Sequence, residues 1–540
     1  MTQFRSGSRW PAIALAAFAL LLVLPVLAVL SAWLQANAQT LDVLQQMAQT
    51  VLPAYSITSV QLCLAVAAGV VLVGTAAAGM VTLFDFPGRR LFEWALLLPL
   101  AMPAYVVAYA YTDFLQFSGP LQTFLRDTFG WRGRVFPEVR NVSGAVWVFT
   151  FTLYPYVYLL VRTALSERAA HLMEAARMLG APLSRRVREV ALPLARPAVA
   201  AGVALALMET LADFGVSSYF GIQTFTAGIY KAWLVMDDRL AAAQLATLLL
   251  AVVALLLWLE QRAQHRLRFV SQRGGRAGGT ESQPVCLRGA RRFGAWLVCG
   301  LPVLFGFVLP VLFMLRPLLG GWQELPWSGF VQWAGNSLRL AGISAVLTTA
   351  AALLLGFAVR RAVVGAQPVA RLVGLGYAVP GAVIVVGLLL PVGWLQTLAP
   401  QSQFGYWVTA TSLGILWAYM VRFTAVALQS VQSGYARIPP NLDESARMLG
   451  TPAWGVLARV HWPLLRRSTA VALLLVFVDV MKELPATLVL RPFNSDTLAV
   501  MTYQLARDER LGEAALPALT LVLVGLVPVV LLSRTLRRAE

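Results

Sequence analysis

Apolar runs of about 20 residues, long enough to cross the hydrocarbon core of a bilayer, recur from one end of the chain to the other. Hydrophobic residues make up 59% of the 540 residues and charged residues only 13%. A water-soluble fold of this composition would expose too much apolar surface. We therefore expect an all-α integral membrane protein with about twelve transmembrane helices. They fall near residues 10–33, 57–83, 91–115, 143–165, 197–219, 240–259, 294–315, 337–359, 369–395, 405–428, 468–490 and 514–533.

The arginines indicate how these helices are oriented. The net charge is +18, and in membrane proteins such an excess collects in cytoplasmic loops, so it does not indicate nucleic-acid binding. Arg5 and Arg9 place the N-terminus inside, and an even number of spans places the C-terminus inside as well. One loop, residues 116–142, carries four arginines although the count places it outside, and we expect a structured external element there.

A tandem duplication divides the chain. Glu174 and Glu444 are separated by half the length of the chain, and the sequence Ala-Arg-Met-Leu-Gly follows both of them at the same spacing. The predicted domains are a first transmembrane half at residues 1–260, a cytoplasmic linker at 261–293 and a second transmembrane half at 294–540. With six spans each, both halves enter the membrane from the same side, which favours a pathway between them.

The repeated segment has the pattern of a helical hairpin. Apolar residues at positions 172, 175, 176 and 179 form one face of a short helix. Gly180 can end that helix in the left-handed conformation, and Pro182 suits the start of a second helix. Pro193 is expected to end the second helix near the next span. Because the pattern occurs twice, a docking element for another protein is favoured over an ordinary amphipathic loop on the bilayer.

The span that follows each hairpin carries acidic residues. Glu209 and Asp213 share a helix face in the first half, and Asp479 and Glu483 occupy the matching positions of the second copy. A carboxylate at mid-bilayer costs roughly 2.5–3.5 kcal/mol, so such residues usually face a cavity or a partner. Two interpretations stay open. The acids line a translocation pathway or gate, or they pair structurally with nearby groups such as Lys482.

The hairpin resembles the coupling motif of ATP-binding-cassette (ABC) importer permeases. Glu-Ala-Ala, three residues, Gly, nine residues, an aliphatic residue, one residue and Leu-Pro fit the first copy, and the second copy departs at Ser445 and Trp462. The resemblance implies the MetI-like fold of type I importer permeases and a location in a bacterial inner membrane. It implies that both hairpins dock on a cytoplasmic ATPase dimer. The implied coupling residues are Glu174, Ala175, Ala176, Gly180 and Pro193, with Glu444, Ser445, Ala446, Gly450 and Pro463 in the second copy.

The resemblance also suggests a cargo and partners. The run from Met208 to Tyr230 is similar to the corresponding helix of ferric-iron permeases of double length. An extracytoplasmic binding protein would then deliver ferric iron. Related permeases carry thiamine, polyamines or phosphonates. The four acids of the two spans do not by themselves show which of these cargoes, or ferric iron, is carried. No phosphate-binding loop occurs, so ATP and magnesium are expected on the partner ATPase, with no cofactor and no metal site in this chain.

Two functions of other classes compete with this interpretation. An ion-coupled secondary transporter would also show duplication and buried acids, but it would not require a repeated cytoplasmic hairpin. A membrane-embedded enzyme is disfavoured because no nucleophile–base pair or metal-ligand cluster is visible in the sequence. We therefore expect a transport subunit without catalytic residues.

Overall fold

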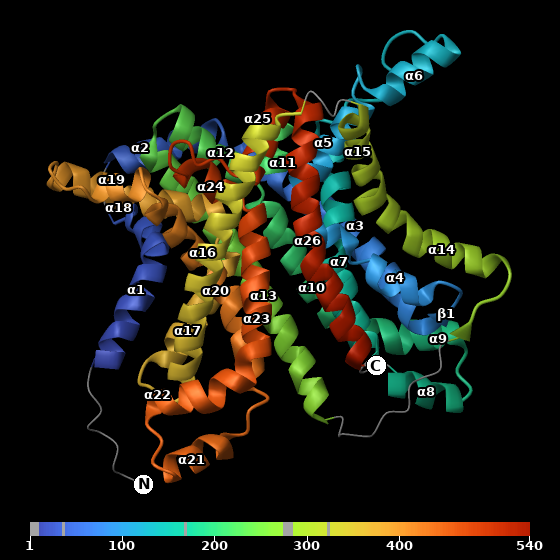
Figure 1. Ribbon diagram of the computed structural model, residues 1–540. Helices are drawn as coiled ribbons and strands as arrows, with labels where there is room; N and C mark the ends of the chain where they lie inside the picture. The colour runs from blue at the N-terminus through green and yellow to red at the C-terminus, as the bar shows by residue number, and fades with distance from the viewer. Residues whose placement is uncertain (1–9, 35–37, 167–169, 274–284, 321–324, 540) are drawn as a thin grey trace. The chain divides into compact units, whose positions relative to one another are not determined.

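The computed structural model describes residues 10–34, 38–166, 170–273, 285–320 and 325–539, and these residues are almost entirely helical (Figure 1). This agrees with the expected all-α class, since a helix satisfies its backbone hydrogen bonds within one segment. The one sheet found in these ranges joins β1 (Phe84–Asp85) and β2 (Val285–Cys286) in parallel, with Phe84 opposite Val285.

Ten helices of the described chain are long and apolar enough to cross a membrane, and a bent pair of helices raises the number to eleven at most. The bent pair, Arg89–Ala101 and Ala104–Phe129, turns by 89°. The expectation of an all-α membrane protein with about twelve spans is therefore confirmed as a fold class, with ten to eleven candidate spans in the described chain. The expected span that is missing from these candidates is α23 (Trp462–Lys482), because its apolar stretch is interrupted by charged residues. These are Arg466, Arg467, Asp479 and Lys482.

The chain forms two compact units that do not coincide with the two sequence halves. Unit 1 contains Met1–Gln45, Ile229–Thr247 and Trp327–Val500. Unit 2 contains Gln46–Gly228, Leu248–Pro326 and Met501–Glu540. Each unit therefore combines the middle of one sequence half with terminal segments of the other. Four helices continue from one unit into the other, namely α2 (Ala38–Gln49), α12 (Phe225–Tyr230), α13 (Arg239–Arg273) and α25 (Leu498–Arg507).

The core of unit 2 is formed by α3 (Leu52–Leu83), α7 (Val142–Ala164) and α10 (Leu192–Ala212), which pack against one another. Small residues allow this packing: a Cβ atom on Gly202 would lie 2.7 Å from the Cα atom of Val157. The other elements of unit 2 are α4 (Arg89–Ala95), η1 (Leu98–Ala101), α5 (Ala104–Leu115), α6 (Pro120–Phe129), α8 (Ala170–Met178), α9 (Leu183–Arg186), the π turn Val187–Ala191, α11 (Gly215–Tyr219), α14 (Ala290–Val303), the π turn Leu304–Val308, α15 (Leu309–Gly320) and α26 (Leu511–Ala539).

The core of unit 1 is formed in the same way by α16 (Trp327–Arg360), α20 (Ser412–Tyr435) and α23. The N-terminal helix α1 (Trp10–Ser31) packs along α17 (Ala366–Gly374) and α18 (Gly381–Leu398). Trp417 Nε1 donates a hydrogen bond of 2.8 Å to the carbonyl of Leu21 on α1. The remaining elements are the π turn Lys231–Val235, η7 (Gly376–Ala378), α19 (Phe404–Thr409), α21 (Pro440–Met448), α22 (Ala453–Val456), the π turn Leu457–His461 and α24 (Pro485–Leu490).

The expected linker at 261–293 includes helical and strand residues on both sides of its undescribed part. Helix α13 continues to Arg273, beyond the expected end of its span, and residues 274–284 lie outside the described ranges. The chain then pairs with the end of α3 through β2, and the amide of Leu287 donates a hydrogen bond of 2.9 Å to the carbonyl of Asp85. The second sequence half thus begins against an element of the first, within unit 2.

Candidate functional site

The repeated segment forms a helical hairpin in the first half, as its pattern predicts. Helix α8 ends at Met178, and Gly180 adopts a left-handed backbone with φ of 78°. The amide of Gly180 donates a hydrogen bond of 2.9 Å to the carbonyl of Arg177, and the amide of Ala181 donates one of 3.0 Å to the carbonyl of Ala176. These two bonds form a Schellman cap, which stops the helix and reverses the chain toward α9.

The second half repeats this cap. Gly450 has φ of 74°, its amide donates to the carbonyl of Arg447 at 2.9 Å, and the amide of Thr451 donates to Ala446 at 3.0 Å. A Cβ atom on either Gly180 or Gly450 would meet open space. The left-handed backbone, and not close packing, is therefore what requires glycine at both turns.

The connection from each hairpin to the next span differs from the expected one. Pro193 does not end a helix, because the chain stays helical from α9 through the π turn Val187–Ala191 into α10. Pro463 follows the matching π turn Leu457–His461 in the second half. A proline lacks the amide hydrogen and clashes with the carbonyl four residues earlier, and the wider π turn accommodates this. Each hairpin is thus a helical extension of its span.

The tips of both hairpins expose apolar side chains. Met178, Leu179, Met448 and Leu449 are each more than four-fifths exposed. Of the predicted coupling residues, Ala175 and Ser445 are exposed, whereas Ala446 is buried against its own half. Glu174 lies 3.7 Å from Arg177, and both side chains are accessible. Exposed apolar residues at a rigid turn are typical of a surface that is covered by a partner.

A polar clamp, formed by Arg360, Asp443 and His461, holds the second hairpin to its unit. Asp443 is buried; its Oδ2 accepts a hydrogen bond of 2.7 Å from Arg360 Nε, and its Oδ1 lies 2.8 Å from His461 Nε2. The hydroxyl of Tyr435 lies 3.4 Å from the other ring nitrogen of His461. Burial by itself would raise the pKa of Asp443, but the hydrogen bonds and charges of His461 and Arg360 outweigh it and lower that pKa.

No pattern within one copy of the repeat predicts this clamp. In the alignment of the two copies, Asp443 corresponds to Met173 and His461 corresponds to Ala191, and these two apolar residues are also buried. Two ionisable residues thus replace two apolar residues at matched positions of the repeat. That paired difference between the copies was the signal available in the sequence.

The repeated acids lie where the span after each hairpin breaks. Asp213 ends α10, and its Oδ1 accepts hydrogen bonds from the amides of Val216 at 2.8 Å and Ser217 at 3.4 Å. Glu483 follows α23, and its two oxygens accept bonds of 2.9 Å from the amides of Ala486 and Thr487. Each acid therefore caps the short helix that begins after the break, α11 or α24, with its side chain on the amides three and four residues ahead.

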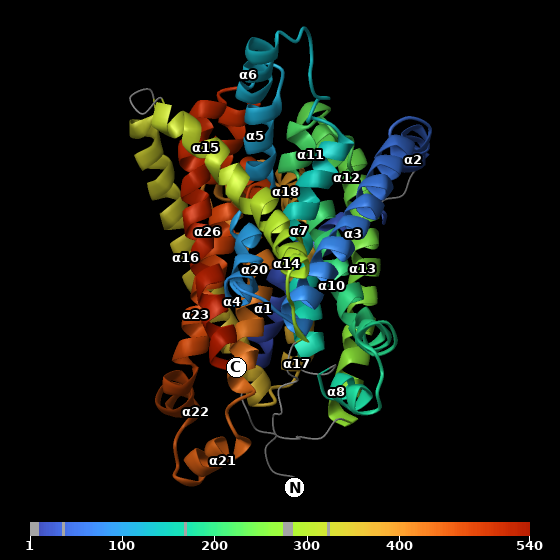
Figure 2. The same cartoon turned by 90° about the vertical axis from the view of Figure 1, so that its right-hand side faces the viewer.

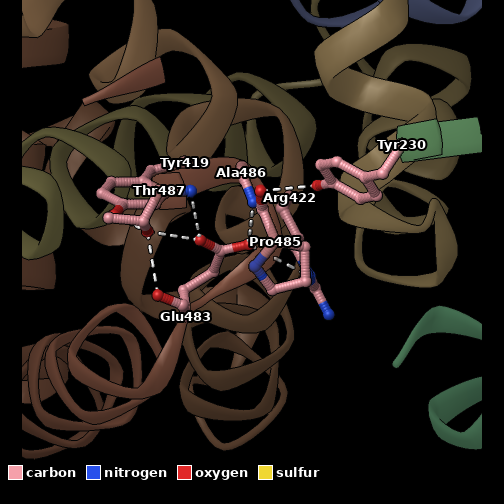
Figure 3. Close-up of polar contacts among 7 residues, drawn as sticks. All are labelled: Tyr230, Tyr419, Arg422, Glu483, Pro485, Ala486 and Thr487. Atoms are coloured by element: carbon pink, nitrogen blue, oxygen red, sulfur yellow. Dashed lines mark hydrogen bonds and ion pairs between the residues drawn. The ribbon is translucent and has the colours of Figure 1, made fainter. Parts of the chain in front are cut away.

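Glu483 has further partners in unit 1 (Figure 3). Its Oε1 lies 3.5 Å from Arg422 Nη1, and the Thr487 hydroxyl donates to its Oε2 and contacts the hydroxyl of Tyr419 at 2.6 Å. The hydroxyl of Tyr230 donates a hydrogen bond to the carbonyl of Pro485 at the same break. Glu483 is 5% exposed, so its charge is balanced by this arginine and by oriented donors.

The other two acids are more accessible. Glu209 lies one helical turn before Asp213 on α10 and is half-buried, and the described residues contain no hydrogen bond or ion pair to its carboxylate. Asp479 occupies the matching position on α23, and it is half-buried as well. Of the four predicted pathway residues, the structure therefore gives a capping role to Asp213 and Glu483, and it leaves Glu209 and Asp479 partly accessible.

Comparison with known protein families gives two matches along the chain, one for each copy of the repeat. The profile of a family described as "Binding-protein-dependent transport system inner membrane component" matches residues 69–269 and again residues 349–539. Each match contains one hairpin and the span that follows it. The two matches together cover more than half of the chain.

Individual relatives are distant in sequence. The chain is 25% identical to the Fe(3+)-transport system permease protein FbpB 2 of Haemophilus influenzae, over 88% of each chain. It is 30% identical to the molybdenum transport system permease protein ModB of Escherichia coli, over 34% of this chain and 81% of that one. A solved bacterial alginate ABC transporter, in complex with an alginate-bound periplasmic protein, aligns with a TM-score of 0.36 at 17% identity, covering 46% of this chain and 94% of the other.

Proposed function

The chain belongs to the family of binding-protein-dependent transport system inner membrane components, and from this premise we propose that it imports ferric iron. As a member it is a multi-pass inner-membrane permease of an ABC importer, a transport subunit and not an enzyme. We propose further that both termini are cytoplasmic and that residues 1–260 and 294–540 act as the two permease halves. The family assignment excludes the ion-coupled secondary transporter considered as an alternative.

One observation carries the proposed coupling to an ATPase. Two hairpins at matching positions of the repeat end in the same left-handed glycine cap and present the same Met-Leu pair to solvent. A rigid helical extension that ends in apolar side chains suits a groove on another protein. The hairpins α8–α9 and α21–α22 would each dock on one subunit of a cytoplasmic ATPase dimer, which would hold the ATP and magnesium.

The helical connection to each span explains how such docking would move the permease. Because the π turn keeps α9 continuous with α10, and α22 with α23, a push on a hairpin is transmitted along a helix and is not lost in a loop. ATP binding would bring the two docked hairpins together and tilt both spans. ATP hydrolysis would reverse this movement.

Cross-linking tests the coupling proposal. Cysteine would replace Ala175 or Ser445, both of which are exposed, in a chain whose three native cysteines, Cys63, Cys286 and Cys299, are changed to serine. Cross-links to a co-expressed ATPase at both positions support docking. The matched control is cysteine in place of Phe124 on α6. This helix lies at the opposite end of unit 2 from α8, which carries Ala175 (Figure 2). Equal capture at all three positions would refute the assignment.

Ferric iron is the finer part of the proposal. It is supported by the match of nearly full length to a relative named for Fe(3+) transport, at low identity. Another relative is named for molybdenum, so cargo varies among similar permeases. Thiamine, a polyamine or a phosphonate is the alternative cargo. ATPase activity of the reconstituted complex should be stimulated by ferric-loaded binding protein and not by thiamine-loaded binding protein.

The accessible acids are proposed to contribute to the pathway or gate. Glu209 and Asp479 occupy matched positions one turn before the helix breaks, and their half-buried carboxylates suit a cationic cargo or its release. Asp213 and Glu483 would act indirectly, since they hold the breaks in place.

A further inference from the structure

Residues 116–141, here called the projecting element, form a small folded unit between α5 and α7. Helix α6 lies at its centre, and Gln122 on this helix is 1% exposed. The side-chain amide of Gln122 donates a hydrogen bond of 2.7 Å to the carbonyl of Leu115, and its oxygen accepts one of 3.1 Å from the amide of Val135. One buried glutamine therefore joins the outgoing chain, the helix and the returning chain.

The base of the projecting element is fixed to unit 2. The guanidinium of Arg140 lies 4.7 Å from the ring centre of Tyr219 on α11, and it is 3.6 Å from the carboxylate of Glu509. Asn141 caps α7 by accepting a hydrogen bond of 2.8 Å from the amide of Gly144. These contacts give the element a defined orientation on the helices below it.

The outer surface of the projecting element is aromatic and basic. Phe124, Phe129 and Trp131 are each more than half exposed, and the last two stack with ring centres 5.3 Å apart. Arg132 and Arg134 follow directly and are exposed. Exposed aromatic residues next to arginine are the composition of protein–protein hot spots.

The position of the element identifies the side of the membrane that it faces. In Figures 1 and 2, α6 stands beyond the ends of its neighbours α5 and α15, whereas α8 lies at the opposite end of unit 2. If α8 faces a cytoplasmic ATPase, as the proposed function holds, then α6 faces outward. The loop carries four arginines and two acids, although arginines usually collect in cytoplasmic loops and not in outward ones. A role other than setting the topology therefore accounts for these arginines.

We propose that the projecting element is a docking site for the binding protein, which the family requires as its partner. Phe124 and the stacked pair Phe129–Trp131 would enter an apolar recess on the binding protein, and Arg132 and Arg134 would pair with carboxylates at the rim of that recess. A lipid surface is the less suitable occupant, because the element extends away from the ends of the membrane helices. This inference rests on the proposed function for its orientation.

The test measures the affinity of purified binding protein for the permease–ATPase complex in nanodiscs. Phe124→Ala combined with Trp131→Ala should weaken binding by about tenfold or more, as expected for the loss of interface anchors. Arg132→Glu combined with Arg134→Glu should weaken binding and invert its dependence on salt. The control Trp407→Ala removes an exposed aromatic residue from α19 and should leave the affinity unchanged. Variant affinities equal to that of the unaltered protein would overturn the proposal.

A second measurement separates the binding protein from the bilayer. A spin label at position 128, an exposed position on α6 that is not one of the proposed anchors, should be accessible in the cysteine-free chain to a water-soluble relaxation agent and should become immobilised when binding protein is added. A label accessible to oxygen in the lipid and unaffected by binding protein would overturn the proposal. Capture of the ATPase and basal ATP hydrolysis report on the proposed function separately. If both are retained while the docking variants bind normally, only the docking site is refuted.

Discussion

Asp443 and His461 are joined by a contact of 2.8 Å between Oδ1 and Nε2, and this contact ties the second hairpin to the start of its own span. Arg360 approaches the other oxygen of Asp443 from the end of α16. The first half has the apolar residues Met173 and Ala191 at these matched positions. The two hairpins therefore share a shape but are held by different forces, one ionic and one apolar.

Replacement of Asp443 should loosen the second hairpin and not the first. Asp443→Ala leaves Arg360 and His461 without their buried partner, and loss of one member of a buried ion pair costs about 3–5 kcal/mol. Hydrogen exchange in residues 440–449 should become faster, and binding-protein-stimulated ATP hydrolysis should fall. Met173→Leu, a conservative change at the matched position, serves as control. Unaltered exchange in Asp443→Ala would contradict the clamp.

Acid should release the same hairpin only well below neutral pH. The pKa of Asp443 is lowered in the folded protein, so its stabilising effect is complete above the ordinary carboxyl pKa of about 4 and is lost as the pH falls further. Hydrogen exchange corrected for intrinsic rates should be constant from about pH 7 to pH 5. A transition near pH 6 would contradict this assignment.

Replacement of the turn glycine by alanine should destabilise each hairpin turn, because the backbone there is left-handed. Gly180→Ala and Gly450→Ala each force a Cβ atom into a left-handed conformation, at a cost of roughly 1–2 kcal/mol. Recovery of the ATPase with the purified permease should fall for each variant and fall further for both together. Gly79→Ala, in the middle of α3 where a Cβ atom also meets open space, should have no effect. Equal recovery of ATPase from all variants would show that the turns do not position the docking surface.

Glu483 should stabilise unit 1 mainly through its ion pair and its capping bonds. Glu483→Gln keeps an acceptor for the amides of α24 but leaves Arg422 without its carboxylate, so thermal unfolding in detergent should occur at a clearly lower temperature. Asp213→Asn keeps the capping oxygen and should have the smaller effect. Combination of Glu483→Gln with Arg422→Met should recover part of the loss. An additive double variant would contradict direct pairing.

The accessible acids should affect transport and not assembly. Glu209→Gln combined with Asp479→Asn removes two half-buried charges and should slow uptake of labelled iron, while the yield of the permease–ATPase complex is unchanged. Unchanged uptake kinetics would remove the proposed role in the pathway.

The local features of this protein were predictable from its sequence, and the non-local ones were not. Helix periodicity and one glycine predicted the turn at Gly180, because a left-handed cap depends on the adjacent backbone alone. The sequence predicts continuous spans at Asp213 and Glu483, where the structure has breaks, because capping by a carboxylate inside an apolar run has no periodic signature. The clamp of Asp443 depends on Arg360, which lies 83 residues earlier and which no local pattern connects to it.

The interleaving of the two compact units has a consequence for biogenesis. Unit 2 begins with residue 46 but takes in α26, which follows all of its other helices in the chain, so the ribosome must make the whole of unit 1 before unit 2 can acquire its final helix. Until then, the first sequence half must remain in the bilayer with the helix surface that packs against α26 uncovered. A premature stop anywhere before residue 501 would leave unit 2 unfinished, and membrane quality-control proteases would remove the product of such a truncated gene.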